Sequence, residues 1–306
     1  MVNDPAPLVG QAVADALGMP FETRLASDPL LVNWDGSYLP SEYHQLDPGQ
    51  WTDDTMMAKM LMESLYICGG FYPRDVANRY LHWYLAGDPR GMGKTTKASL
   101  QRLKEGSRWT DSGIDNAEGN GTAMRSAPMG AFYHDDPLTV AEFARMESKI
   151  THQSIEAREG SAAVALMVAF IWQGVNKFDL IEATLDFLNN SKIKDKLIIL
   201  SKTKDRLSLP EAFSIFGTKS HVTQTVPSAA TSFMLTNSYE EAVMAAIRAG
   251  GDTDTTAAIT GALAGAYYGF EAIPKKYRLG LERMDHLHQL DTHIGVGPNT
   301  AVMWKL

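Results

Sequence analysis

Apolar residues recur at three- and four-residue steps along most of the chain, which is the spacing of one face of an α-helix. The clearest case lies between residues 54 and 68, where Met57, Met60, Leu61 and Leu65 follow this spacing. Similar patterns predict helices over residues 74–86, 94–104, 139–150, 155–173, 179–188 and 239–249. The strict alternation of a half-buried strand is scarce. The sequence therefore predicts an all-α fold, a compact helical bundle.

Small residues repeat every four positions in two segments. One set is Gly10, Ala14 and Gly18, and the other is Ala257, Gly261, Gly265 and Gly269. Glycine inside a helix costs about 1 kcal/mol relative to alanine, so its repeated use needs a compensating contact. We expect two central helices whose backbones approach each other closely along these stripes.

The chain shows no linker, no internal repeat and no low-complexity tract, and residues 1–306 are predicted to form a single domain. The segment 201–225, rich in Ser, Thr and Lys, has the weakest pattern and is interpreted as a surface excursion. The longest apolar run, 162–172, is far shorter than the roughly 20 residues of a membrane span. It is interpreted as a buried helix.

Charge and composition narrow the class of protein. The net charge is −8, which does not favour nucleic-acid binding. Cys68, the single cysteine, cannot form a disulfide within the chain, and residues 1–7 lack the features of a signal peptide. We therefore expect a cytoplasmic protein without a membrane segment, and the oligomeric state stays open.

Two clusters of Asp and Thr carry the strongest chemical signal. Residues 51–55 read Trp-Thr-Asp-Asp-Thr and open one predicted helix, while residues 250–256 read Gly-Gly-Asp-Thr-Asp-Thr-Thr and open another. Carboxylates at a helix start can simply be caps, but a cap needs only one of them. Four carboxylates brought together would repel one another unless cations lay among them. Oxygen ligands of this kind suit Mg²⁺ or Mn²⁺. The residues alone therefore allow two interpretations, well-capped helices or a metal site.

Two glycine-rich loops are candidate ligand contacts. Residues 119–125 read Gly-Asn-Gly-Thr-Ala-Met-Arg. This motif could form an ordinary Asn-Gly turn, or its glycines could let the backbone approach a ligand closely. In the second case, the free amides of the helix that is expected to follow could hold a phosphate. Residues 91–96, Gly-Met-Gly-Lys-Thr-Thr, are similar to a P-loop. The position of its first glycine is Asp88, and a helix instead of a strand precedes it, so a nucleoside triphosphatase is not expected.

Taken together, these segments resemble the ADP-ribosylglycohydrolase family over nearly the whole chain. The resemblance begins with Gly10 and residues 15–22, Asp-Ala-Leu-Gly-Met-Pro-Phe-Glu, and continues through 51–55, 119–125 and Thr151-His152. It ends with residues 250–255 and 261–266. The order and spacing of these motifs are more specific than any one of them.

The resemblance implies an all-helical fold with two Mg²⁺ or Mn²⁺ ions at the base of a cleft, and a hydrolase that releases ADP-ribose from a modified acceptor. It implies the following metal ligands: Thr52, Asp53, Asp54, Asp252, Asp254 and Thr255. It implies contacts with ADP-ribose from Gly119, Asn120, Gly121 and His152. Gly91 and Gly93 of the other glycine-rich loop are added as candidate substrate contacts because that loop can line a ligand cleft. The candidates for the acid and base chemistry are Glu22, Asp53, Asp54 and Asp254.

Our mechanistic hypothesis is that the metals align the ribose and activate a water, with a carboxylate as general acid or base. The chain departs from the family where many members carry an Asp in the loop matched by residues 90–93, since that position is Gly91 here. In one member, the dinitrogenase reductase-activating glycohydrolase, that Asp has been assigned a catalytic role. Ala14 also replaces a usual glycine. The acceptor therefore stays open between arginine, serine, a nucleic-acid base and a small molecule, with arginine the first choice.

Two other readings remain as alternatives. An isoprenoid synthase would also be all-helical and Mg²⁺-dependent, but its Asp-Asp-x-x-Asp motif is missing because Asp53 and Asp54 are followed by Thr55, Met56 and Met57. A protein that binds ADP-ribose without cleaving it, or has a structural role, is the non-enzymatic alternative.

Overall fold

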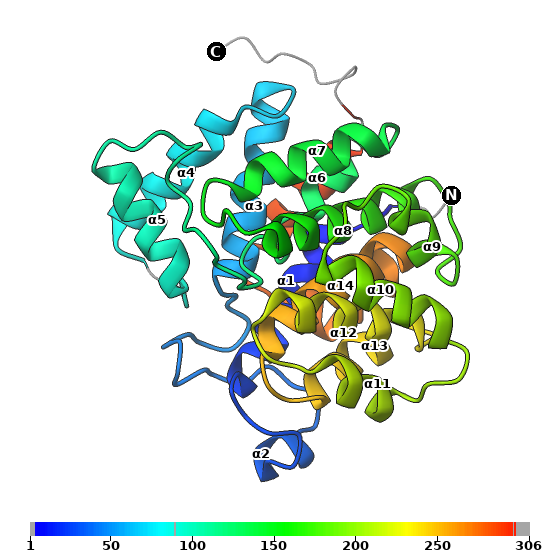
Figure 1. The fold of residues 1–306 in the computed structure, drawn as a ribbon. Helices are drawn as coiled ribbons and strands as arrows, with labels where there is room; N and C mark the ends of the chain where they lie inside the picture. The colour runs from blue at the N-terminus through cyan, green and yellow to red at the C-terminus, as the bar shows by residue number, and fades with distance from the viewer. Residues whose placement is uncertain (1–3, 89, 296, 298–306) are drawn as a thin grey trace.

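Helices make up most of the computed structural model, which describes residues 4–88, 90–295 and 297 (Figure 1). Within these residues there is no named strand, only four isolated bridges, and the predicted all-α fold is confirmed. The α-helices are α1 Pro7–Gly18, α2 Pro29–Val32, α3 Asp53–Cys68, α4 Pro73–Ala86, α5 Lys94–Lys104, α6 Ala127–Phe132, α7 Pro137–Ser148, α8 Ile155–Trp172, α9 Leu180–Leu185, α10 Lys192–Thr203, α11 Leu209–Phe216, α12 Val222–Met234, α13 Tyr239–Arg248, α14 Thr253–Tyr268, α15 Lys275–Gly280 and α16 Met284–Ile294. Two short 3-10 helices, η1 Met19–Phe21 and η2 Phe270–Ala272, complete the elements.

Helices α1 and α14 lie side by side at the centre of the molecule (Figure 1). A Cβ on Gly10 would lie 2.3 Å from the Gly261 carbonyl oxygen, and one on Gly265 would lie 2.3 Å from the Ala6 carbonyl oxygen. Only glycine permits this approach, so the predicted close packing of the two small-residue stripes is confirmed. Gly269 is an exception, because it lies after the end of α14, where its φ of +82° suits a helix C-cap.

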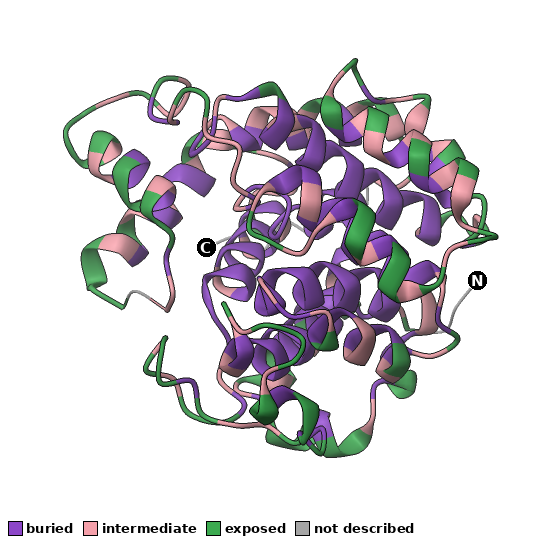
Figure 2. Cartoon of the chain, turned by 60° about the horizontal axis from the view of Figure 1, so that its bottom comes forward, coloured by how far each residue is buried: buried purple, intermediate pink, exposed green. Residues whose placement is uncertain are grey.

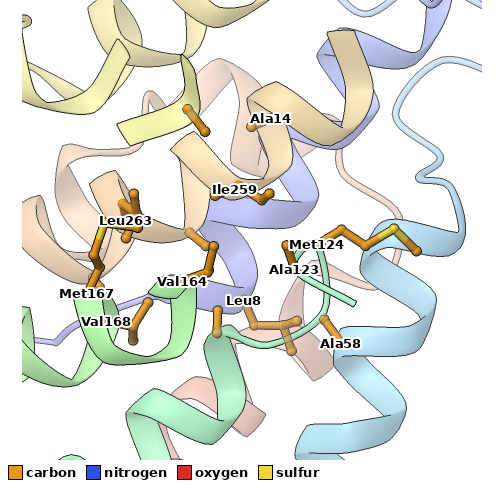
Figure 3. Packing of buried hydrophobic residues seen from close by; sticks show 14 of the residues in the cluster. Leu8, Ala14, Ala58, Ala123, Met124, Val164, Met167, Val168, Ile259 and Leu263 are labelled. Atoms are coloured by element: carbon orange, nitrogen blue, oxygen red, sulfur yellow. The ribbon is translucent and has the colours of Figure 1, made fainter. Parts of the chain in front are cut away.

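The other helices surround this pair and bury its apolar faces (Figure 2). Val164, Met167 and Val168 of α8 pack toward Ile259 and Leu263 of α14 (Figure 3). The apolar run 162–172 thus forms the buried part of α8, as predicted. None of the helices in the described residues combines the length and apolar character that crossing a bilayer requires.

The helix ends follow the local sequence. Helix α3 begins after Thr52, whose hydroxyl accepts a hydrogen bond from the Asp54 amide, and ends at Gly69, whose φ is +66°. Helix α7 begins two residues before the predicted position, because the Asp136 side chain caps it and proline occupies its first position. Helix α9 is shorter than the predicted range 179–188 and ends at Leu185.

Residues 201–225 lie mainly at the surface up to the start of α12, as expected, but they contain more regular structure than their weak pattern indicates. This segment contains α11 and the first turns of α12. A capping box starts α11, since Ser208 and Glu211 each bond the other's backbone amide. Ala212 and Phe216 of this helix are buried. The Ser-x-x-Glu spacing and the proline at the helix start were present in the sequence and could have revealed this helix.

Candidate functional site

A cavity of about 680 Å³ opens where the starts of α3 and α14 meet two loops. Its volume lies within the roughly 300–1,000 Å³ typical of small-molecule sites. All the predicted site residues line it except Thr52, which is fully buried at the start of α3. The lining residues are Glu22, Tyr43, His44, Gln45, Asp53, Asp54, Gly91, Met92, Gly93, Lys94, Thr95, Thr96, Lys97, Gly119, Asn120, Gly121, Met124, His152, Ser220, Asp252, Asp254 and Thr255.

The start of α3 is held in place by a buried carboxylate from α1. Both oxygens of Asp15 accept from the Thr52 amide at 3.1 Å, and one also accepts from the Thr55 amide at 3.2 Å and from its hydroxyl at 2.6 Å. The Thr52 hydroxyl donates to Asp54 Oδ2 at 3.1 Å. Because Asp15 binds the free amides of this helix start, Asp53 and Asp54 do not act as caps and extend into the cavity.

The start of α14 is tied to the N-terminal loop through backbone contacts. The Thr23 amide donates to the Gly251 carbonyl, and the Gly251 amide donates to the Arg24 carbonyl, each at 2.7 Å. Asp252 occupies the N-cap position, but its side chain makes no capping hydrogen bond. The side-chain amide of Asn120 instead donates to Asp252 Oδ2. The four carboxylates of the two predicted clusters therefore all line the cavity, which sequence periodicity alone could not show.

Burial and mutual repulsion oppose ionisation of these carboxylates. Burial raises the pKa of Asp53 to about 7, and the charge of Asp15 adds to the shift. Burial, followed by the charge of Glu22, raises the pKa of Asp252 to about 6. Burial also raises the pKa values of Asp54 and Asp254 well above the usual range. Burial is the main cause of these shifts, and the repulsion between neighbouring carboxylates adds to it.

The donor set fits divalent cations that prefer oxygen ligands. In the described part of the chain, neither Lys nor Arg forms an ion pair with the four aspartates of the two helix starts. Among the same residues, Asp54 Oδ1 and Asp254 Oδ1 are buried without a hydrogen-bond partner. Buried carboxylate oxygens without donors are costly unless a cation or water reaches them. This arrangement favours the metal reading over simple helix capping.

The loop of residues 90–93 forms one wall of the cavity. The guanidinium of Arg90 binds both carboxylate oxygens of Glu282, at 2.7 and 2.9 Å, and stacks over Trp51 at 4.4 Å. The Gly93 amide donates to Asp53 Oδ2 at 3.3 Å. Helix α4 precedes this loop, so the structural context of a P-loop, a preceding strand, is absent here.

The Gly119–Gly121 loop and His152 form the opposite wall. A Cβ on Gly121 would lie 3.1 Å from His152 Cε1, and one on Gly119 would lie 3.4 Å from His152 Nε2. Burial, with the nearby charge of Arg125, lowers the pKa of His152 to about 3, so the imidazole is neutral. Residues 121–125 form turns, and the expected helix, α6, begins after them at Ala127.

Sequence reasoning missed His44, although the structure places it at the centre of the carboxylate cluster. Its Nε2 lies 2.6 Å from Glu22 Oε2 and 3.6 Å from Asp254 Oδ2. Burial lowers the pKa of His44, but contact with Glu22 outweighs this effect and raises it overall. His44 lies in an irregular segment with no recognisable motif, so its position depends on the loop that carries it. The cavity also contains Lys94 and Lys97, which were not predicted.

A larger cavity, of about 890 Å³, lies elsewhere and is lined mainly by α11 and α13. It contains none of the predicted site residues, and among the described residues its acidic side chains, Glu240 and Glu241, belong to no group that could hold a metal ion. Size alone therefore does not identify the functional site, and the chemistry points to the smaller cavity.

Known proteins share this sequence and fold. The ADP-ribosylglycohydrolase family model matches residues 6–298. An uncharacterised protein of Archaeoglobus fulgidus is 32% identical over 94% of both chains. The ADP-ribosylarginine hydrolase Tri1 of Serratia proteamaculans is 26% identical, covering 92% of this chain and 76% of the relative. The ADP-ribosylhydrolase ARH3 of Mus musculus is 28% identical, covering 78% of this chain and 76% of the relative.

A solved structure described as an ADP-ribosylglycohydrolase-related protein complex superimposes with a TM-score of 0.80 at 28% identity. The match covers 95% of this chain and 96% of the other. The family model and the structural match both extend over nearly the whole chain, and the range of the family model includes the two Asp and Thr clusters. This chain belongs to the ADP-ribosylglycohydrolase family.

Proposed function

We propose that this protein is a metal-dependent hydrolase that cleaves the N- or O-glycosidic bond between ADP-ribose and a modified acceptor. Family membership supports the reaction class. Relatives named as an ADP-ribosylarginine hydrolase and an ADP-ribosylhydrolase support an ADP-ribosylated substrate. Arginine-linked ADP-ribose is the first acceptor to test, because one of the relatives is named as an ADP-ribosylarginine hydrolase.

The observation that carries the proposal is the meeting of four buried aspartates in one cavity, two of which keep a carboxylate oxygen without a hydrogen-bond partner. Two Mg²⁺ or Mn²⁺ ions would be held by Thr52, Asp53, Asp54, Asp252, Asp254 and Thr255. Such ions, when bound, lower the pKa of a water and offer Lewis-acid contacts to ribose hydroxyls.

Glu22 is suited to the proton transfer. Its side chain is 19% exposed, more than those of the buried aspartates, so it can contact both the cavity and solvent. It comes from the loop that the Gly251 backbone holds beside the start of α14. We assign Glu22 the role of general base or acid, with Asp53, Asp54 and Asp254 shaping the reacting centre.

The opposite wall is suited to the ADP part of the substrate. Gly119 and Gly121 leave the backbone accessible beside the imidazole of His152, and Gly91 and Gly93 do the same across the cavity. Asn120 contributes indirectly, because its amide nitrogen is committed to Asp252 and Thr225. Lys94 and Lys97 add positive charge that would attract a diphosphate.

The test is to incubate the protein with arginine-, serine- and DNA-linked ADP-ribose in Mg²⁺, Mn²⁺ or chelator, and to quantify free ADP-ribose. Release from one substrate that the chelator stops supports the proposal and identifies the acceptor. Asp254→Ala should abolish this release, and wild-type turnover in that variant would contradict the assigned site. Metal-dependent binding of ADP-ribose with no release from any substrate would favour a non-catalytic binding protein.

A further inference from the structure

We propose that the imidazole of His44, which lies beside Glu22 and Asp254, is a nitrogen ligand of the divalent-cation centre, and that it makes this centre favour a transition-metal ion over Mg²⁺. The inference rests on the metal centre of the proposed function and specifies its chemistry. None of the ligands expected from the sequence supplies a nitrogen atom.

The geometry brings three ligand atoms to one point. One atom each from Glu22, His44 and Asp254 lies within 4.8 Å of the other two. The His44 side chain is only 4% exposed, and that of Asp254 only 5%. These groups come from two distant parts of the chain, the 22–44 loop and the start of α14, so the fold and not the local sequence assembles them.

The short contact between His44 and Glu22 is not a satisfied hydrogen bond. Although His44 Nε2 and Glu22 Oε2 lie 2.6 Å apart, neither buried atom has a hydrogen-bond partner with acceptable angles among the described residues. Asp254 Oδ1 is orphaned in the same way. Glu22 Oε2 and Asp254 Oδ2 both approach His44 Nε2, so two carboxylates and an imidazole nitrogen surround one point, an arrangement suited to a shared cation.

The rest of the structure holds the imidazole in this orientation. The His44 amide donates to Ser41 Oγ at 3.2 Å, and Ser41 in turn donates to the Met19 carbonyl at 3.2 Å. The Tyr43 ring packs edge-on against the imidazole at 4.9 Å. Nδ1 faces Gly91, where a Cβ would lie only 2.6 Å away, so Nε2 is the nitrogen directed to the carboxylates.

The chemical consequence is a change in metal preference. Mg²⁺ prefers oxygen ligands and regular octahedral geometry, whereas imidazole nitrogen suits first-row transition metals. A centre with one imidazole therefore discriminates against Mg²⁺ more than a centre of carboxylates and hydroxyls does.

Pulsed electron paramagnetic resonance of the full chain loaded with Mn²⁺ tests this directly. We expect ¹⁴N coupling characteristic of a bound imidazole in the wild type, lost in His44→Gln and kept in His152→Gln, the matched variant of the other cavity histidine. Wild-type protein with ¹⁵N-labelled histidine should show the corresponding ¹⁵N coupling, which keeps the test valid even where a variant fails to fold.

Calorimetry provides the second readout. His44→Gln should lower Mn²⁺ affinity about tenfold or more, while Mg²⁺ affinity changes much less. The proposal is overturned if Mn²⁺ binds without imidazole coupling, if His152→Gln removes that coupling, or if Mn²⁺ does not bind. ADP-ribose release, measured on the same samples, separates these outcomes from failure of the hydrolase proposal, because a chain can bind Mn²⁺ through His44 and release no ADP-ribose.

Discussion

Gly91 and His44 lie so close that a Cβ on Gly91 would come within 2.6 Å of His44 Nδ1. Gly91 also has a φ of +82°, a conformation that strains any L side chain. The absence of a side chain at this position is therefore what lets the imidazole occupy the wall of the cavity. The departure from the family pattern at this loop and the unexpected histidine are parts of one arrangement.

Gly91→Ala should destabilise the protein for two reasons, the strain of a positive φ and the clash of the new Cβ with His44. The control is Gly87→Ala, because Gly87 has a φ of +76° but a Cβ there would meet nothing within 4 Å. We expect Gly87→Ala to cost about 1–2 kcal/mol, and Gly91→Ala to cost about 1–3 kcal/mol more. Urea unfolding measures both, and His44→Ala in the Gly91→Ala background should recover part of the difference. Equal losses at the two glycines would contradict the contact.

Removal of Asp15 should weaken both the fold and the metal centre. Asp15→Ala leaves the amides of Thr52 and Thr55 buried without an acceptor, so we expect a loss of about 1–3 kcal/mol. Because the start of α3 loses its support, Mn²⁺ affinity should fall about 10–100-fold. Chemical denaturation and calorimetry measure the two effects. Asp35→Ala, at an exposed turn, is the control, and its Mn²⁺ affinity should equal that of the wild type.

Acid should destabilise the protein through His152. The pKa of this imidazole is lowered to about 3 in the folded state, so below pH 6.5 the unfolded chain binds a proton that the folded chain does not. The contribution of His152 to the free energy of unfolding is therefore fully present above pH 6.5, and it is lost as the pH falls from 6.5 toward 3. Between pH 7 and pH 5 the wild type should lose about 2 kcal/mol more than His152→Gln, which has no titrating imidazole. Parallel losses in the two proteins would show that His152 titrates normally.

Alanine at Gly10 should separate the two central helices. Its Cβ would meet the Gly261 carbonyl oxygen at 2.3 Å and the Gly265 Cα at 2.9 Å, and both are backbone atoms that cannot rotate away. We expect a loss of about 3 kcal/mol or more in the free energy of unfolding. Gly93→Ala, where a Cβ would meet nothing within 4 Å, should cost at most about 1 kcal/mol. A mild effect at Gly10 would mean that α1 and α14 can move apart freely.

Neutralising one carboxylate of the cluster should stabilise the metal-free protein. Burial and the charges of Glu22 and Asp252 raise the pKa of Asp254, which means that its ionised form is disfavoured. Asp254→Asn replaces this carboxyl group with a neutral amide of similar shape. In chelator at pH 8 its melting temperature should rise by on the order of 2 °C, the shift that about 1 kcal/mol gives a chain of this size. Added Mn²⁺ should raise the wild-type melting temperature above that of the variant. If the wild type gains nothing from Mn²⁺, the cluster is not a cation site.

The helices and their ends could be predicted largely from local sequence. The three- and four-residue spacing in α3 and α8, Thr52 as a cap and Gly69 as a terminator are local signals that tertiary packing did not override. The repeated glycines also predicted the close approach of α1 and α14 correctly. The regular structure within residues 201–225 was not predicted, because the capping box of α11 went unrecognised although the sequence contains it.

The helical class, the family and the two acidic helix starts follow from the amino-acid sequence, because periodicity, caps and ordered motifs depend on neighbours along the chain. Three contacts become visible only in the folded protein: Asp15 holds the start of α3, Asn120 binds Asp252, and His44 lies beside Glu22 and Asp254. These contacts join segments far apart in sequence, and the loop of residues 22–44 has no periodicity from which its path could be inferred. The partners of a side chain in such a segment depend on the path of the backbone. That path is set by how the segment packs against the helices around α1 and α14.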